Sequence, residues 1–183
     1  MPSPIGHALG GVAAAWASPE RISTPLTLVC AVLAAAPDLD LLVPGWHRTV
    51  THSVGAVVIV TIVAAGVTGW VTRRNTWSVW RVWRIAGICG LAYASHILLD
   101  WLGTDPNPPF GIQAFWPFSH QWFIAGWTIF PVTERRSFFS WAAFATNAKA
   151  VAVELIILGP VVLGLGALRA GRAGGAGKAS GAN

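Results

Sequence analysis

The sequence predicts an all-α protein, a polytopic membrane bundle of about four to five helices. Hydrophobic residues make up 54% of the 183 residues and charged residues only 10%, which leaves too little polar surface to cover a soluble globule. Several apolar runs approach the length of about 20 residues that crosses a hydrocarbon core as a helix. The 11 tryptophans are typical of side chains that anchor helices at membrane interfaces.

The first apolar run, residues 5–17, is shorter than a full crossing. It predicts either a thin span or a buried helix of half length. Its small residues Gly6, Gly10 and Ala14 recur at every fourth position, which permits close packing against another helix.

The next three helices follow from proline positions and apolar length. The second helix is expected from Pro25 to about Ala36, because the residue before Pro37 resists helical dihedral angles. Residues 53–71 then form an apolar run without a formal charge, the clearest membrane span in the chain. Residues 85–102 are expected to form the span after it.

Between these spans, residues 73–84 interleave arginine with tryptophan. Such a pattern can bind nucleic acid through phosphate contacts and base stacking. It is also typical of a cytoplasmic loop at the headgroup interface, which we favour because the surrounding chain is apolar. No nucleic-acid partner is therefore expected.

The second half of the chain contains one further span. Residues 103–149 are mixed, and we interpret residues 110–132 as a segment outside the membrane or re-entrant against the site, with a full crossing as the alternative. A last span over residues 150–168 closes a single domain, residues 1–168. The tail, residues 169–183, is basic and rich in glycine and alanine, which predicts disorder.

Ionisable side chains are scarce but gather in a polar segment, residues 36–53, between two apolar runs. This segment contains Asp38, Asp40, His47 and His52. Carboxylate oxygens and imidazole nitrogens are ligands of zinc and other divalent metals, and burial penalises them unless a cation or hydrogen bond compensates. The segment predicts a metal site, with turn chemistry and helix capping as the alternative role for its polar residues.

A second group of residues supports this prediction. His96 and Asp100 stand four residues apart in an apolar helical context, so they share one face and can address one ion. A plain hydrogen bond between them is the alternative. His7 fits equally well as a ligand or as a partner that orients one. Arg48 can hold an anionic substrate oxygen or pair with an aspartate of the polar segment.

Three polar residues are weaker candidates. His120 and Gln121 interrupt an aromatic stretch, and Glu154 is the single carboxylate of the last span. Glu154 needs a partner in lipid, which either the site or the interface can provide.

The order of these motifs resembles a known family. After His7 come Pro-Asp-Leu-Asp (residues 37–40), His-Arg-x-x-Thr-His-Ser (47–53), His-x-x-x-Asp (96–100) and Trp-Pro-Phe-Ser (116–119). Over residues 3–120 this combination resembles the bacterial inner-membrane metal-dependent hydrolases, which implies hydrolase activity and a multi-pass location in the inner membrane. A looser likeness to zinc-dependent bacterial phospholipases C, which also use a His-x-x-x-Asp pair, directs the substrate toward a lipid phosphoester.

Positive charges predict the orientation of the bundle. If residues 73–84 are cytoplasmic and the spans alternate, eight Lys and Arg side chains fall inside: Arg21, Arg73, Arg74, Arg81, Arg84, Arg169, Arg172 and Lys178. Four fall outside: Arg48, Arg135, Arg136 and Lys149. All candidate ligands then lie toward the outer face, where four segments converge as a site in a helical bundle requires.

The sequence thus predicts a membrane-bound, metal-dependent hydrolase with membrane lipids as partners and a phosphoester or lipid-linked substrate. The expected metal ligands are His7, Asp40, His52, His96 and Asp100, and the residues expected in catalysis are Asp38, His47 and Arg48. Asp38 or His47 would complete the ligand set or act as the base. Zinc is the first candidate ion and manganese the second. The alternatives are a non-catalytic protein held together by a metal or polar cluster, and an ion or solute transporter, although we find no internal repeat.

Overall fold

The computed structural model describes residues 1–20, 22–43, 46–73, 77–135 and 139–180, with side chains placed up to residue 172. These residues form five α-helices, two short 3-10 helices and no β-strand, which confirms the all-α prediction. The helices are α1 (Pro4–Ala17), α2 (Thr24–Ala35), η1 (Ala36–Leu42), η2 (Val50–His52), α3 (Val54–Thr72), α4 (Val79–Trp101) and α5 (Trp141–Ser180).

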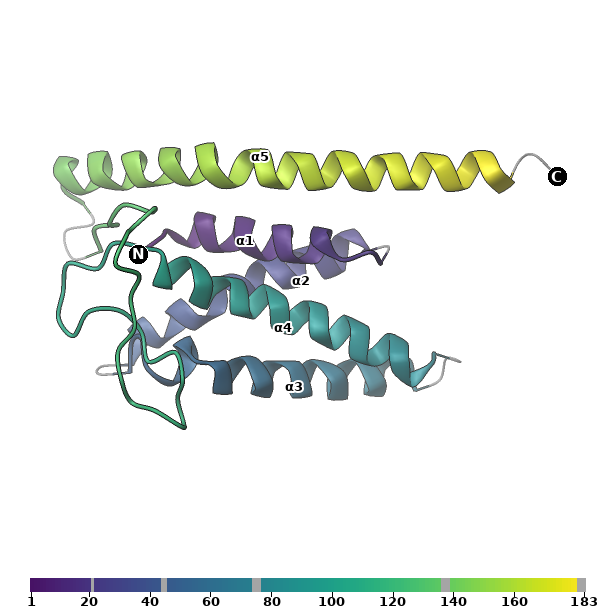
Figure 1. Cartoon of the computed structure of the whole chain (residues 1–183), viewed down its shortest axis with the longest axis horizontal. Helices are drawn as coiled ribbons and strands as arrows, with labels where there is room; N and C mark the ends of the chain where they lie inside the picture. Colours follow the sequence, from purple (N-terminus) through teal and green to yellow (C-terminus); the bar gives the residue numbers. More distant parts are fainter. Residues whose placement is uncertain (21, 44–45, 74–76, 136–138, 181–183) are drawn as a thin grey trace.

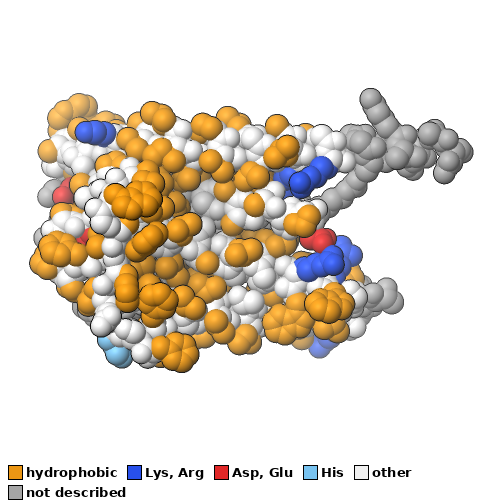
Figure 2. Space-filling view, viewed as in Figure 1, with side chains coloured by type: hydrophobic (Ala, Val, Ile, Leu, Met, Phe, Trp, Pro, Cys, Tyr) orange, Lys and Arg blue, Asp and Glu red, His pale blue; other side chains and the backbone are white. Residues whose placement is uncertain are grey.

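Four helical segments are long and apolar enough to cross a membrane: Thr24–Leu42, Val54–Thr72, Val79–Trp101 and Trp141–Arg172. The helices lie side by side, and successive helices alternate in direction (Figure 1). The amino terminus, the polar segment and the chain between α4 and α5 therefore meet at one end of the bundle, which we call the site end. Apolar side chains cover the length of the helices and charged ones gather near the two ends (Figure 2).

Helix α1 is too short to span, yet it is central and packs against α2, α4 and α5. The chain thus adopts the half-length alternative for its first apolar run. A Cβ at Gly11 would lie 2.4 Å from the Cys30 carbonyl oxygen of α2, and one at Gly10 would lie 2.8 Å from Leu99 of α4. Small residues therefore do bring the helices close, with Gly11 rather than Ala14 at the tightest contact.

The second α-helix ends within one residue of the expected end and before Pro37, but the reason given for that end is wrong. The α-helix ends at Ala35, but Ala36 keeps helical dihedral angles (φ −63°, ψ −34°) and the chain continues as η1 to Leu42. Proline is tolerated because it stands in the first turn of η1, where its missing N–H has no helical partner in any case. The two pieces together make 19 residues, enough for a full crossing.

Two other helices are longer than predicted. Helix α4 begins at Val79, because Ser78 caps it by accepting a hydrogen bond from the Arg81 amide, so half of the arginine and tryptophan stretch is helical. Helix α5 begins at Trp141 and continues to Ser180. The first part of the tail, which was expected to be disordered, is therefore helical up to that residue.

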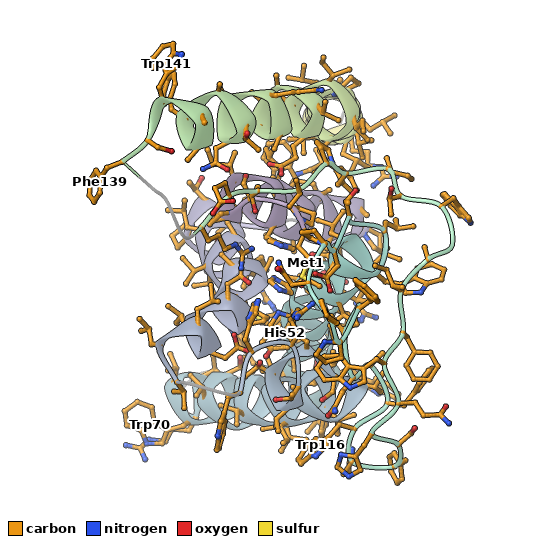
Figure 3. The ribbon with its side chains drawn as sticks, turned by 90° about the vertical axis from the view of Figure 1, so that its left-hand side faces the viewer. Met1, His52, Trp70, Trp116, Phe139 and Trp141 are labelled. Atoms are coloured by element: carbon orange, nitrogen blue, oxygen red, sulfur yellow. The ribbon has the colours of Figure 1, made fainter. Side chains whose placement is uncertain are left out.

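The described chain between α4 and α5 forms no α-helix and folds over the site end. Backbone hydrogen bonds hold it there, from Val54 N to Ala114 O (2.8 Å) and from Gln113 N to Arg48 O (3.0 Å). Lipid-exposed irregular backbone is not tolerated inside a bilayer, so this segment does not cross. Seen from the site end, Phe139 and Trp141 point outward at the rim, as aromatic side chains do at a membrane interface (Figure 3).

Glu154 of α5 is fully buried and anchors α5 to the start of α1. Its carboxylate accepts hydrogen bonds from the Ser3 amide (2.6 Å) and the Ser3 hydroxyl (2.5 Å). Gly6 makes room, since a Cβ there would lie 2.7 Å from the carboxylate. The partner that the Glu154 carboxylate needs within the membrane is thus Ser3, away from the histidines of the polar segment.

Gly11→Ala should destabilise the protein by about 1–3 kcal/mol, because the added methyl group would force α1 away from the backbone of α2. Gly66→Ala is the matched control, since no atom lies within 4 Å of its Cβ position on α3. We expect a lower melting temperature in detergent for Gly11→Ala alone. Equal melting temperatures for the two variants would contradict the close contact between α1 and α2.

Candidate metal centre

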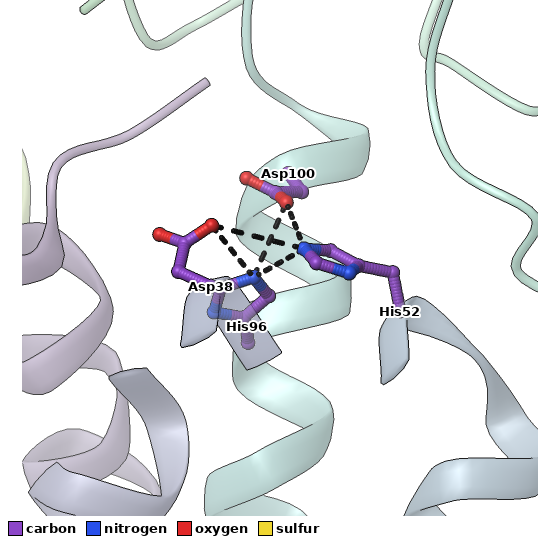
Figure 4. A group of neighbouring side chains, drawn as sticks. All are labelled: Asp38, His52, His96 and Asp100. Atoms are coloured by element: carbon purple, nitrogen blue, oxygen red, sulfur yellow. Dashed lines mark hydrogen bonds and ion pairs between the residues drawn. The ribbon is translucent and has the colours of Figure 1, made fainter. Parts of the chain in front are cut away.

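Four potential ligand atoms face one another at the site end (Figure 4). They belong to Asp38 on η1, His52 at the end of η2, and His96 and Asp100 on α4, and all lie within 4.8 Å of one another. We call these four residues the cage. Histidine and aspartate at positions i and i+4 share one face of α4, as predicted, and η2 brings His52 in from the start of α3.

Three of the cage atoms form a compact triangle. His52 Nε2 lies 3.0 Å from His96 Nε2, and Asp100 Oδ2 lies 3.3 Å from the first and 3.2 Å from the second. Asp38 Oδ1 is further out, at 3.9 Å and 4.0 Å from the same two nitrogens. Ligands at bond lengths of about 2.0–2.1 Å around tetrahedral zinc lie about 3.3 Å apart, so the triangle fits such an ion closely and Asp38 fits it loosely.

Both cage histidines are held by their Nδ1 atoms. His96 Nδ1 lies 2.7 Å from the Ala34 carbonyl oxygen, and His52 Nδ1 lies 3.0 Å from the Thr51 hydroxyl and 3.1 Å from Asp40 Oδ2. The Thr51 hydroxyl donates its proton to Asp40, and a carbonyl and a carboxylate only accept hydrogen bonds. Each Nδ1 therefore carries the proton, and each Nε2 presents a lone pair to the cage. Two lone pairs 3.0 Å apart repel unless a proton or a metal ion lies between them.

Asp100 also requires a positive charge. It is fully buried, and neither of its carboxylate oxygens accepts a hydrogen bond from the described residues. His7 approaches it from α1, with Nε2 3.3 Å from Asp100 Oδ1 and its ring stacked on His96 at a centroid distance of 3.7 Å. His7 is not one of the four cage residues, and its position favours the role of orienting partner that the sequence left open.

Asp40 lies behind the cage and holds the polar segment together. Its carboxylate lies 2.7 Å from His47 Nδ1 and accepts hydrogen bonds from the Thr51 hydroxyl (2.5 Å) and the Arg48 amide (3.2 Å). Together with His52, Asp40 and His47 form a second group of potential ligand atoms.

The structure therefore brings Asp38, rather than Asp40, to His96 and Asp100. From the sequence, Asp40 was expected among the ligands, and Asp38 was expected either to complete the ligand set or to act as the base. In a 3-10 helix, with three residues per turn, side chains two positions apart point in different directions, so only one of the pair can face the cage. Motif spacing alone does not identify which one.

Two arginines reach the site, and the sequence singled out only one of them. Arg48 adopts a φ of 67°, and its side chain pairs with Asp105 rather than with an aspartate of the polar segment. Asp38 pairs instead with Arg135, whose guanidinium nitrogens lie 3.3 Å and 3.4 Å from its oxygens. Nearly a hundred residues separate that pair, and the only sequence signal was a charge in the outer chain.

The weaker candidates His120 and Gln121 are exposed and lie outside the cage.

Electrostatics favour a cation in the cage. Burial lowers the pKa of the His52 imidazole, but the neighbouring carboxylates of Asp100, Asp38 and Asp40 outweigh this effect, so the pKa lies well above its usual value. At neutral pH the cage therefore attracts a cation, either a proton or a metal ion.

Comparison with known proteins identifies the family. Neither a curated protein nor a solved structure matches this chain. The profile of the YdjM inner membrane proteins matches residues 1–173, which include every cage residue and all four candidate spans. The match and the apolar helices together describe a multi-pass protein of the inner membrane. The chain belongs to the YdjM inner membrane protein family.

Proposed function

We propose that this protein is a metal-dependent hydrolase that holds zinc, or in second place manganese, in the cage and cleaves a phosphoester or lipid-linked substrate. The observation that carries the proposal is the pair of Nε2 atoms 3.0 Å apart, each on a ring whose Nδ1 is already hydrogen-bonded. Beside them lies a buried carboxylate, that of Asp100, which accepts no hydrogen bond from the part of the chain that the structure describes. These donors have the chemistry that divalent zinc prefers.

The spacing of the donors favours a catalytic centre. His52, His96 and Asp100 form the compact triangle, and three protein ligands with an open fourth position are typical of catalytic zinc. Asp38 Oδ1 is further out, at 3.9 Å from His52 Nε2 and 4.0 Å from His96 Nε2. With an ion held by the triangle, Asp38 would therefore accept a proton from water rather than complete the ligand set.

The residues around the triangle have separate roles in the proposed reaction. A bound divalent ion supplies Lewis acidity and brings the pKa of its water to about 7. Asp38 takes the proton, and His47, oriented through Nδ1 by Asp40, is the group that we assign to protonating the leaving group. Arg48 acts structurally, since its side chain is bound to Asp105 and to the Asn107 carbonyl oxygen.

A structural metal site is the second candidate, because all four cage residues can reach one ion and three of them are fully buried. A closed set of four protein ligands is typical of structural zinc. The transporter alternative gains no support, since the cage residues lie on η1, at the end of η2 and near the end of α4, rather than at the middle of the spans.

We also propose that the site end faces the periplasm. The opposite end of the bundle carries Arg73, Arg81, Arg84, Arg169 and Arg172 among the described residues. Lys and Arg accumulate on the cytoplasmic side of membrane proteins, which assigns that end to the cytoplasm.

His96→Ala should lower the zinc content of the purified protein at least about tenfold and abolish hydrolysis, because it removes one corner of the triangle. His120→Ala is the matched control, an exposed histidine outside the cage. The zinc content per chain is measured by metal analysis of the folded, monodisperse variants. Equal zinc content in the two variants would refute a metal ion in the cage.

Asp38→Asn separates catalysis from structure. If Asp38 is the base, this variant keeps its zinc but loses turnover by about 100-fold or more against phosphoester and lipid-linked substrates. Loss of zinc together with a lower melting temperature would instead establish Asp38 as a fourth ligand of a structural site.

Asn107→Cys should react with a membrane-impermeant maleimide added to spheroplasts, because residue 107 is exposed at the site end. Arg73→Cys at the opposite end should react only after the membrane is permeabilised. The native Cys30 and Cys89 are buried and provide the background. The opposite labelling pattern would place the site in the cytoplasm.

A further inference from the structure

A cavity of about 410 Å³ lies beside the cage at the site end. Two of its lining residues connect it to the site: His47 contacts Asp40, and Arg135 pairs with Asp38. Arg48 and Asp105 also line it, but they neutralise each other in a direct ion pair. Arg135 is therefore a cation that stands between the cavity and the cage, and the amino-terminal residue Met1 also lines the cavity.

Arg135 is held in place from two directions. The residue before it, Glu134, is fixed by Asn147 of α5, which accepts a hydrogen bond from the Glu134 amide (2.8 Å) and donates one to its carbonyl oxygen (2.9 Å). The guanidinium itself donates to the Pro2 carbonyl oxygen at 3.3 Å. A guanidinium positioned before a ligand arrives loses less entropy on binding an oxyanion.

The charges around Arg135 change when a metal ion binds. Without an ion, Arg135 is the counter-ion of Asp38. With a divalent ion in the cage, the two carboxylates of Asp38 and Asp100 offset its two charges, so the charge of Arg135 is left for a ligand. Glu134 also lines the cavity, and its carboxylate repels anions. An oxyanion would therefore be held best where it reaches the guanidinium and the ion together.

Asp38 shows that one carboxylate can reach both the Arg135 guanidinium and the cage. Its Oδ1 lies 3.3 Å from the Arg135 guanidinium and 3.9 Å from His52 Nε2 at the same time. A phosphate group has several oxygens with comparable spacing, and guanidinium groups bind phosphate in a bidentate manner.

The rim of the cavity is apolar on the side of the bilayer. Leu41 and Val132 line the cavity, and the neighbouring Leu42 is 81% exposed at the end of a candidate span. An amphiphile can therefore keep its hydrocarbon chains in the membrane while its phosphate enters the cavity.

We propose that Arg135 binds a phosphate group in this cavity, next to the cage. The inference rests on the proposed function, because it takes this phosphate to belong to the substrate or product of the hydrolase. The shared chemistry is the phosphate, carried either on a membrane lipid or free in the periplasm.

The test is the affinity of the full-length protein for inorganic phosphate, measured by titration calorimetry in detergent after incubation with zinc. Arg135→Gln should weaken binding at least about tenfold, the effect of losing one charge-assisted contact. Arg81→Gln is the matched control, because Arg81 is exposed and lies over the Trp77 ring, on the first turn of α4 away from the cavity. Phosphate binding that is equally strong in wild type and Arg135→Gln, or absent from wild type in every arm below, overturns the proposal.

A second arm distinguishes the two sources of phosphate. The same three proteins are placed in nanodiscs that contain phosphatidic acid or only phosphatidylcholine, and lipid binding is followed by native mass spectrometry. Retention of phosphatidic acid that is lost in Arg135→Gln supports a lipid-borne phosphate. Loss of affinity for inorganic phosphate alone supports a soluble ligand.

A positioning variant and the zinc content separate this inference from the proposed function. Asn147→Ala keeps Arg135 but releases its support, and should weaken phosphate binding less than Arg135→Gln does. Zinc content is measured on every sample, and the comparison of wild type with Arg135→Gln is made whether or not zinc is retained. If Arg135→Gln binds zinc and hydrolyses substrate with an unchanged KM, the role of Arg135 is overturned and the proposed function stands. If the protein holds no zinc but still binds phosphate in a way that depends on Arg135, the hydrolase is overturned and the role of Arg135 stands.

Discussion

The approach of His52 Nε2 to His96 Nε2 at 3.0 Å is the contact on which the rest of the site depends. Each ring has its other nitrogen committed to an acceptor, the Asp40 carboxylate for one and the Ala34 carbonyl for the other. Two facing lone pairs in a buried setting require a cation, and the buried Asp100 beside them adds a negative charge. The fold thus places lone pairs and a negative charge together in a buried setting, and a divalent ion would compensate them.

The packing of the helices explains how these buried polar groups are accommodated in a mostly apolar protein. Helix α1 is short and its glycines allow α2 and α4 to close around it, while Glu154 ties α5 to its first turn. Alternating helix directions bring η1, η2 and the end of α4 to one end of the bundle. The described part of the chain between α4 and α5 then covers that end without an α-helix and supplies Arg135, so the cage is enclosed by segments that need not cross the bilayer.

Much of this arrangement was predictable, because it depends on local patterns. Apolar runs gave the spans, and the spacing of His96 and Asp100 gave one face of α4. The choice between Asp38 and Asp40 was not predictable, since it depends on the dihedral angles of a 3-10 helix that the sequence does not specify. Arg135 was missed as a site residue for a different reason: its pairing with Asp38 is set by tertiary contacts alone. The hydrolase chemistry stays a prediction.

The most direct test of the central claim is X-ray absorption spectroscopy at the zinc edge on protein purified without added chelator. The account predicts about one bound ion per chain, with two imidazole nitrogens among light-atom ligands at about 2.0–2.2 Å and no sulfur neighbour. A protein that is folded but free of metal, or one whose bound ion shows sulfur ligands, would contradict it.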